Sequence, residues 1–153
     1  MSAAPSVSDP ANQRLSRLFW LIVIFGALAL FFVINFRVVV VDGHSMEPTY
    51  RAGQRLLMTN AYWLFGRIDR GDVVVIRIPT GNLLIKRVVA LPGEEVPEAY
   101  RGPVNVSLGT RVPEGHIFVV GDNLERSEDS RVLGFISLRW VEGKIVGGKG
   151  ELP

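Results

Sequence analysis

Cysteine is absent from this chain of 153 residues. Disulfide bonds and thiolate metal sites are therefore excluded. Histidine is scarce: His44 and His116 are the two residues of this type. We find no set of residues with the spacing of a metal or cofactor site, and we expect neither a metal nor a cofactor.

The chain also lacks a strong charge of one sign. It carries 17 Lys and Arg against 15 Asp and Glu, although its isoelectric point is near 9.3. From Asn35 onward the two signs are interspersed, and no basic run or stripe appears. A nucleic-acid-binding surface requires such a patch, so we expect no nucleic-acid partner.

One long apolar run is present, from Leu18 to Ile34, and it contains no charge, amide or proline. Seventeen residues of helix span roughly 25 Å, the short end of the range for a transmembrane helix. A cleaved signal peptide would have small residues after its apolar core. Here Asn35-Phe36-Arg37 follows, so we expect a retained anchor.

Basic residues on either side of the run bear on its orientation. Arg14 and Arg17 precede it, and Arg37 follows it. A short basic tail before a first helix favours a cytoplasmic amino terminus. We therefore expect a short cytoplasmic tail (1–17), a transmembrane anchor (18–34) and an extracytoplasmic domain (35–153).

The domain after the anchor is predicted to be mostly β, a small antiparallel sheet or barrel-like structure. Val, Ile and Leu dominate short segments that Gly, Pro and Asp separate, which is typical of strands and turns. Pro79 to Asn82 is predicted to be a hairpin turn, and no segment here has helical periodicity. The expected strands are Arg37–Asp42, Gln54–Asn60, Asp72–Pro79, Leu83–Leu91, His116–Gly121 and Leu138–Val146.

Lys86 is a lysine in one of these apolar segments. Strand alternation places it on the face of Leu84, Val88 and Ala90. Burial disfavours a charged amine, and a lysine with a lowered pKa can act as a general base. For a single lysine, a surface position on an edge strand is the more common alternative.

Ser45 stands in a segment with Gly43 before it and Pro48 after it. This composition predicts a tight loop that could present a hydroxyl and an oxyanion-binding amide to a substrate. An ordinary turn serine is the alternative. Neighbouring side chains of an extended chain point to opposite sides, so His44 is poorly placed as the base for Ser45.

Two further groups of polar residues are candidates. His116 with Asp122 or Asp72 is an alternative base and orienting group for Ser45. The segment 127–131 contains Ser127, Asp129 and Arg131; a serine there could hydrogen-bond and orient the lysine amine. Asp129 and Arg131 could also form an ordinary surface pair of little energetic value.

Four segments in order resemble the motifs of type I signal peptidases, also called leader peptidases. They are Ser45-Met46-Glu47-Pro48-Thr49, Arg70-Gly71-Asp72-Val73-Val74, the segment Lys86 to Glu94 (KRVVALPGE), and Gly121-Asp122-Asn123 with Ser127-Glu128-Asp129-Ser130-Arg131. The resemblance runs from about Val38 to Val146 and includes the anchor.

The resemblance implies a membrane-bound serine endopeptidase that removes signal peptides from exported preproteins after Ala-X-Ala sites. It implies that Ser45 is the nucleophile, with its amide in the oxyanion hole, and that Lys86 is the general base. Ser127 would orient the lysine, and an Asp129–Arg131 pair would hold the loop. The preprotein would bind in extended form by adding a strand to an edge.

The chain departs from the family pattern in two places. Gly43 occupies the oxyanion-hole position where many members carry a serine, so compensation by another donor is expected. Twenty-seven residues separate Glu94 from Asp122, where larger members insert an accessory β-domain. The chain thus resembles a near-minimal catalytic core, which we expect to be monomeric.

Other interpretations remain. A membrane-tethered β-domain adaptor would need neither Ser45 nor Lys86, and self-cleaving repressors would need a DNA-binding domain upstream. Mitochondrial inner-membrane peptidases resemble the chain around 121–131, but a bacterial plasma membrane is the preferred location. We expect the apolar segment Tyr62-Trp63-Leu64-Phe65 to pack in the core or to cap a hairpin; contact with lipid headgroups is the alternative.

Overall fold

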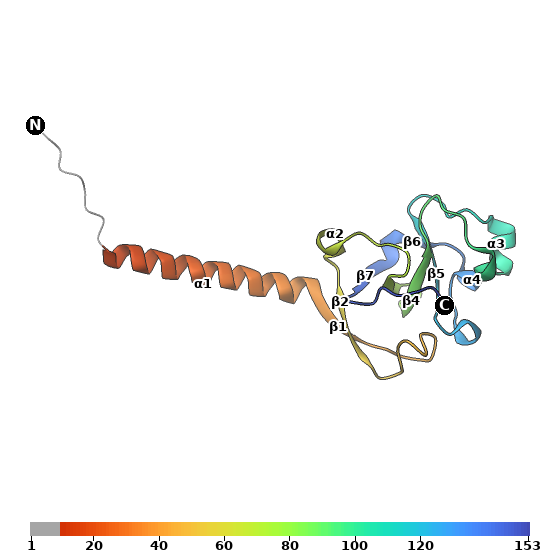
Figure 1. The fold of residues 1–153 in the computed structure, drawn as a ribbon, viewed down its shortest axis with the longest axis horizontal. Helices are drawn as coiled ribbons and strands as arrows, with labels where there is room; N and C mark the ends of the chain where they lie inside the picture. Colours follow the sequence, from red (N-terminus) through yellow and green to blue (C-terminus); the bar gives the residue numbers. More distant parts are fainter. Residues whose placement is uncertain (1–9) are drawn as a thin grey trace, which may run out of the picture. The chain divides into compact units, whose positions relative to one another are not determined.

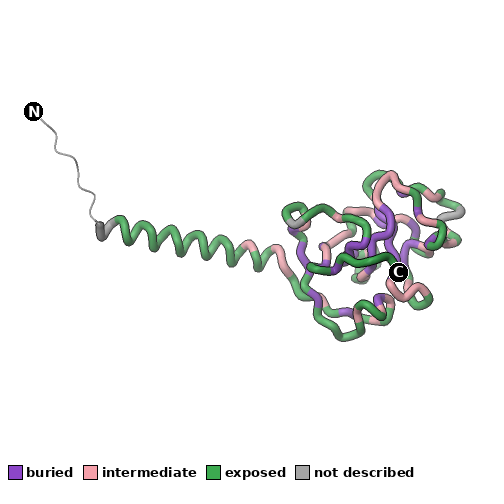
Figure 2. The backbone as a smooth tube through the Cα atoms, viewed as in Figure 1, coloured by how far each residue is buried: buried purple, intermediate pink, exposed green. Residues whose placement is uncertain are grey.

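A long helix forms the first of two units in the computed structural model, which describes residues 10–153. Helix α1 (Pro10–Asn35) is exposed over nearly its whole length (Figure 2). Its segment Gln13–Asn35 is long and apolar enough to cross a membrane. Residues 10–17 of the expected tail thus belong to the helix, and residues 1–9 lie outside the described part.

The second unit, Phe36–Pro153, contains one seven-stranded sheet (Figure 1). Every neighbouring pair of strands is antiparallel, and the order is β1-β2-β7-β3-β4-β5-β6. The predicted mostly-β domain is confirmed. The strands are β1 (Phe36–Val40), β2 (Arg55–Thr59), β3 (Val73–Arg77), β4 (Leu83–Ala90), β5 (His116–Val120), β6 (Ile136–Ser137) and β7 (Val141–Ile145).

The structure adds elements that the sequence pattern did not predict. Strand β6 has two residues, and three short helices follow α1: α2 (Tyr62–Phe65), α3 (Pro103–Leu108) and α4 (Ser130–Leu133). Three 3₁₀ turns lie at Glu98–Tyr100, Leu124–Arg126 and Leu138–Trp140. The last of these replaces the first three residues of the expected strand 138–146. Segments of four to six residues are too short to show helical periodicity.

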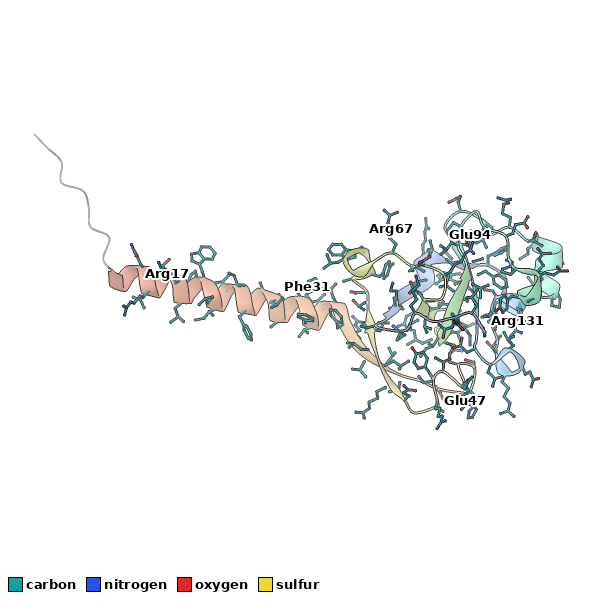
Figure 3. All side chains as sticks on the ribbon, viewed as in Figure 1. Arg17, Phe31, Glu47, Arg67, Glu94 and Arg131 are labelled. Carbon is teal, nitrogen blue, oxygen red and sulfur yellow. The ribbon has the colours of Figure 1, made fainter. Side chains whose placement is uncertain are left out.

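Helix α2 presents large apolar side chains to solvent. Trp63 is 69% exposed and Leu64 is 56% exposed. The expectation that this segment packs in the core is therefore wrong for these two residues. Arg67, in the loop after α2, is also exposed and points away from the domain (Figure 3).

Strands β3 and β4 form the predicted hairpin. The Ile78 amide donates to the Asn82 carbonyl at 3.1 Å, and Gly81 has φ +92°. Only glycine adopts such a φ at little cost. The hairpin register pairs Val74 with Lys86 and therefore determines the level at which Lys86 lies in the sheet.

Strand β3 crosses the middle of the core. Its residues Val73, Val74, Val75 and Ile76 are all buried, because the two faces of the strand pack against different clusters. Val73 and Val75 pack with Val41, Met46, Leu56, Met58 and Ile145. Val74 and Ile76 pack with Val88, Ile117, Val119 and Ile136. A strand buried on both faces gives a continuous apolar run instead of alternation.

Candidate active site

Ser45 lies in the turn that follows β1. The neighbouring Met46 is 1% exposed and packs in the core beside β1 and β2. The Ser45 carbonyl accepts a hydrogen bond of 3.0 Å from the Asn123 amide, in the loop after β5. The backbone of Ser45 is therefore held from two sides, while its side chain is only partly buried.

Lys86 on β4 reaches the Ser45 side chain. Its Nζ lies 2.8 Å from Ser45 Oγ, in hydrogen-bonding geometry. Lys86 is 2% exposed, and burial lowers its pKa, opposed in part by the charges of Asp129 and Glu128. The surface position considered for this lysine is wrong, and a neutral amine next to a hydroxyl is able to remove its proton.

Asp129 and Arg131 form an ion pair at the start of α4. The Asp129 carboxylate is fully buried and accepts from Arg131 Nε at 2.9 Å and from the Gly121 amide at 2.9 Å. Burial raises the pKa of this carboxyl group, but the Arg131 hydrogen bond and the other donors outweigh it and lower the pKa. The Asp129 end of this ion pair is buried and holds the loop after β5 in place. The alternative of a surface pair is therefore wrong.

Ser127 lies in the same loop, yet the expected hydrogen bond to Lys86 is not formed. Within the described residues, Ser127 Oγ is buried and has no partner at hydrogen-bonding distance and angle. It is nevertheless close enough to the Asp129 carboxylate to help lower the pKa of that group. An orienting role of Ser127 therefore stays a prediction.

Gly121, the first residue after β5, lies directly against the turn that contains Ser45. A Cβ added at this position would lie 2.3 Å from Ser127 Oγ and 2.4 Å from the Ser45 carbonyl oxygen. No side chain fits between these atoms. Sequence reasoning included Gly121 in a motif but assigned it no role; its close approach to Ser45 depends on the tertiary structure.

Gly43 precedes the nucleophile by two residues and has φ +88°. A Cβ at this position would have no atom within 4 Å, so the backbone conformation, and not space, favours glycine here. L-residues rarely adopt this φ. A second oxyanion donor in this region remains a prediction.

The histidines take no part in this arrangement. His44 Nδ1 pairs with Glu47 Oε1 at 2.9 Å, and His116 Nδ1 lies 3.0 Å from the Glu114 carbonyl. The carboxylates considered as partners of His116 bind cations instead: Asp122 pairs with Arg87, and Asp72 pairs with Lys144. The described residues thus contain no Ser-His-Asp set around Ser45.

A groove runs from Ser45 and Lys86 along the adjacent strands. Its volume is about 820 Å³, and it is lined by Val38–Asp42, from β1 and the residues after it, and by Leu83–Lys86 of β4, with Val75 and Arg77 of β3. Two strand segments of mostly apolar residues beside a nucleophile suit an extended peptide.

Comparison with known proteins gives the family. The family described as "Signal peptidase, peptidase S26" matches residues 13–102 and 98–147. The chain belongs to this family. Signal peptidase I of Bacillus amyloliquefaciens is 34% identical, covering 92% of this chain and 88% of the relative. Signal peptidase I of Bacillus caldolyticus is 32% identical, covering 77% and 80%. Mitochondrial inner membrane protease subunit 1 of Xenopus tropicalis is 36% identical over 71% of this chain and 65% of its own length.

Family membership and structure agree on several points. The chain is a signal peptidase of the serine endopeptidase type, and its N-terminal helix α1 is the membrane anchor. The relatives include bacterial enzymes and mitochondrial inner-membrane enzymes.

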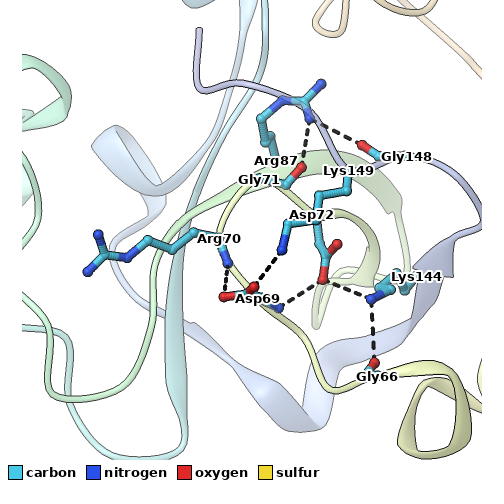
Figure 4. Close-up of polar contacts among 9 residues, drawn as sticks. All are labelled: Gly66, Asp69, Arg70, Gly71, Asp72, Arg87, Lys144, Gly148 and Lys149. Carbon is cyan, nitrogen blue, oxygen red and sulfur yellow. Dashed lines mark hydrogen bonds and ion pairs between the residues drawn. The ribbon is translucent and has the colours of Figure 1, made fainter.

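The most buried ion pair of this signal peptidase was not predicted from the sequence. Arg87 follows Lys86 on β4, and its guanidinium binds the Asp122 carboxylate through two hydrogen bonds of 2.8 and 2.6 Å. Arg87 also donates to the carbonyls of Gly71 and Gly148 (Figure 4). Both side chains are at most 4% exposed. The signal was an arginine within a mostly apolar strand segment, where a buried charge requires a partner.

Proposed function

We propose that this chain is a membrane-anchored signal peptidase I that cleaves preproteins by a Ser45–Lys86 dyad. The observation that carries the proposal is the 2.8 Å contact between Ser45 Oγ and a lysine amine that is 2% exposed. A serine hydroxyl is a weak nucleophile unless a base removes its proton. Burial supplies that base by lowering the pKa of Lys86.

The dyad accounts for both halves of peptide hydrolysis. Neutral Lys86 takes the Ser45 proton as Oγ attacks the scissile carbonyl carbon, and the resulting ammonium gives a proton to the departing amine. Lys86 then takes a proton from a water molecule that attacks the acyl ester, and it returns the proton to Ser45 Oγ. The Ser45 amide is the proposed donor to the oxyanion, and Ser127 is the proposed orienting group for Lys86.

The substrates are proposed to be signal peptides that carry small residues before the cleaved bond. An extended segment bound between β1 and β4 has alternate side chains facing the groove. Valine and leucine side chains line much of it, which favours small apolar substrate residues. We propose a bacterial plasma membrane with a cytoplasmic amino terminus. Arg14 and Arg17 precede the anchor, and the relative from Bacillus amyloliquefaciens aligns over 92% of the chain, against 71% for the mitochondrial relative from Xenopus tropicalis.

The proposal is tested by cleavage of a preprotein with an Ala-X-Ala site by full-length protein in lipid. Wild type, Ser45→Ala, Lys86→Ala and His116→Ala are compared. We expect kcat to fall by about 10⁶ for Ser45→Ala and by about 10²–10⁴ for Lys86→Ala. His116→Ala should retain activity.

Lys86→Arg separates the general base from a merely positive group, because a guanidinium stays protonated. We expect this variant to be as inactive as Lys86→Ala. Strong residual activity of Lys86→Arg would exclude Lys86 as the base. Equal cleavage by all variants would mean a contaminating protease and would leave a non-enzymatic adaptor as the function.

A further inference from the structure

Strand β7 is followed by a segment that contains neither helix nor strand, residues 147–153. Its backbone is bonded to the domain at two points. The Gly150 amide donates to the Gly71 carbonyl at 3.1 Å, and the Tyr100 hydroxyl donates to the Pro153 carbonyl. The family match ends at residue 147, so membership of the family assigns this segment no role.

The backbone of the 147–153 segment covers the Arg87 guanidinium. Arg87 Nη1 donates to the Gly148 carbonyl at 3.2 Å and to the Gly71 carbonyl at 2.7 Å (Figure 4). A Cβ added at Gly150 would lie 3.0 Å from Arg87 Nη1, and a Cβ added at Gly71 would lie 2.3 Å from the Gly150 carbonyl oxygen. Glycine at 71 and 150 therefore lets two backbones close over the guanidinium, whose side chain is 3% exposed.

Arg87 in turn holds the loop that fixes the nucleophile. Its guanidinium binds the Asp122 carboxylate through hydrogen bonds of 2.8 and 2.6 Å. The next residue, Asn123, donates its amide to the Ser45 carbonyl at 3.0 Å. A continuous series of contacts thus leads from the 147–153 segment through Arg87 and Asp122 to the nucleophile turn.

The position of the guanidinium depends on how completely its donors are satisfied. A guanidinium carries five N–H donors in a fixed plane, and a buried donor without an acceptor costs free energy. Gly148 supplies one of the acceptors, and the backbone around Gly150 keeps water away. Without this cover, Arg87 can turn toward water and draw Asp122 with it, which loosens the Asn123–Ser45 hydrogen bond.

We propose that Gly148 and Gly150 are positioning residues for the nucleophile, acting through Arg87 and Asp122. Both lie outside the described lining of the groove beside Ser45, so they act without touching the substrate. The inference rests on the proposed Ser45 chemistry and adds to it a part of the chain outside the four motif segments. The segment acts by its backbone, which explains why its side chains, apart from small glycines, are exposed.

Two variants of the full-length protein in lipid test this inference. A stop codon after Val146 removes the whole segment. We expect kcat for an Ala-X-Ala peptide to fall by about 10- to 100-fold with KM unchanged, because a misplacement of about 1 Å can cost roughly 10²-fold. Gly150→Ala is the milder variant. Gly150 does not have a positive φ, so its backbone tolerates alanine, and we expect a several-fold loss of kcat as the methyl group displaces Arg87.

The matched control is Leu152→Ala, because this side chain belongs to the same segment, is 38% exposed and leaves the backbone unaltered. It should keep wild-type kcat and KM. All assays are made at a temperature at which melting curves show each variant folded, so a merely stabilising segment would leave kcat unchanged. Amide hydrogen exchange adds a structural readout. Exchange at Asn123 should become faster in the truncated chain and in Gly150→Ala, also in a Ser45→Ala background.

Each outcome has one meaning. Loss of kcat at constant KM with faster exchange at Asn123, in Gly150→Ala and not in Leu152→Ala, supports the positioning role. Wild-type kcat in folded Gly150→Ala overturns it, as does a rise in KM alone, which would indicate substrate binding. If the truncated chain does not fold, Gly150→Ala decides. Equal cleavage by wild type and Ser45→Ala is failure of the proposed catalysis; Ser45-dependent cleavage that ignores Gly150→Ala is failure of this inference alone.

Discussion

The Lys86 amine and the Ser45 hydroxyl lie 2.8 Å apart although 41 positions separate them in the chain. Two backbone arrangements maintain this contact. The β3–β4 hairpin sets the position of Lys86, and the Asn123 amide holds the Ser45 carbonyl. The reactive pair thus depends on elements that are themselves well packed.

Peptidase activity is expected to rise with pH through the lowered pKa of Lys86. Burial is the main cause of that lowering, and only the neutral amine can accept the serine proton. The measurement is kcat/KM against pH for a peptide substrate. The expectation would be contradicted if kcat/KM changed near pH 6.5, the ordinary pKa of histidine, and if this change disappeared in His116→Ala.

Folding stability should depend on the same group. The unfolded chain holds the Lys86 proton up to the ordinary pKa of 10.5, whereas the folded chain releases it at lower pH. Between the two pKa values the unfolded state binds more protons, so stability rises with pH. We expect Lys86→Met to be more stable than wild type at neutral pH, by a margin that shrinks as the pH approaches 10.5.

Thermal unfolding at neutral and alkaline pH measures this difference. Leu84→Met on the same strand is the control, because it changes shape without changing charge. A margin for Lys86→Met that stayed constant with pH would mean that packing, and not the lysine charge, determines the effect.

Gly121→Ala is expected to damage catalysis more than folding. The added methyl group would lie 2.4 Å from the Ser45 carbonyl oxygen and 2.3 Å from Ser127 Oγ, so the nucleophile turn must shift. A misplacement of about 1 Å can cost roughly 10²-fold in rate. Steady-state kinetics with a melting curve tests this, and Gly26→Ala, which meets no atom within 4 Å, is the control. Unchanged kcat/KM in Gly121→Ala would show that the turn adapts freely.

Asp122→Ala is expected to reduce the free energy of unfolding by about 3–5 kcal/mol, because it leaves the buried Arg87 charge without its carboxylate partner and with the carbonyls of Gly71 and Gly148 as its remaining acceptors. The matched control is Glu142→Ala, which breaks the pair of Arg77 with Glu142, whose side chains are 50% and 32% exposed. Exposed pairs contribute less than about 1 kcal/mol. Denaturant titration measures both. Similar losses for the two variants would contradict the importance of burial.

Much of the fold was predictable from local pattern. Apolar β-branched segments separated by Gly, Pro and Asp gave six strands close to their observed positions, and Pro79–Asn82 predicted the hairpin turn. The two-residue strand β6 and the short helices were not predictable. They form because neighbouring elements hold them, and four residues of α2 or α4 have no periodicity to read.

The candidate site, like the fold, was predictable from the sequence only in part. Ser45 and Lys86 could be chosen from the sequence, since a serine in a glycine-containing loop and a lysine in an apolar strand are local features. The internal position of the Asp129–Arg131 pair, the Arg87–Asp122 pair and the narrow space at Gly121 could not be predicted. Each joins segments far apart in the chain or depends on how completely a loop is covered.

The sequence by itself determined the membrane anchor, the β-rich domain, the family resemblance and the residue types available for chemistry, because these depend on composition and short-range periodicity. Only the tertiary structure decided that Lys86 is buried against Ser45 and that Trp63 faces outward. It also decided that the two histidine rings bind Glu47 and the Glu114 carbonyl. Burial and distance set a pKa and permit a proton transfer, and both come from the packing of strands that are remote in the chain.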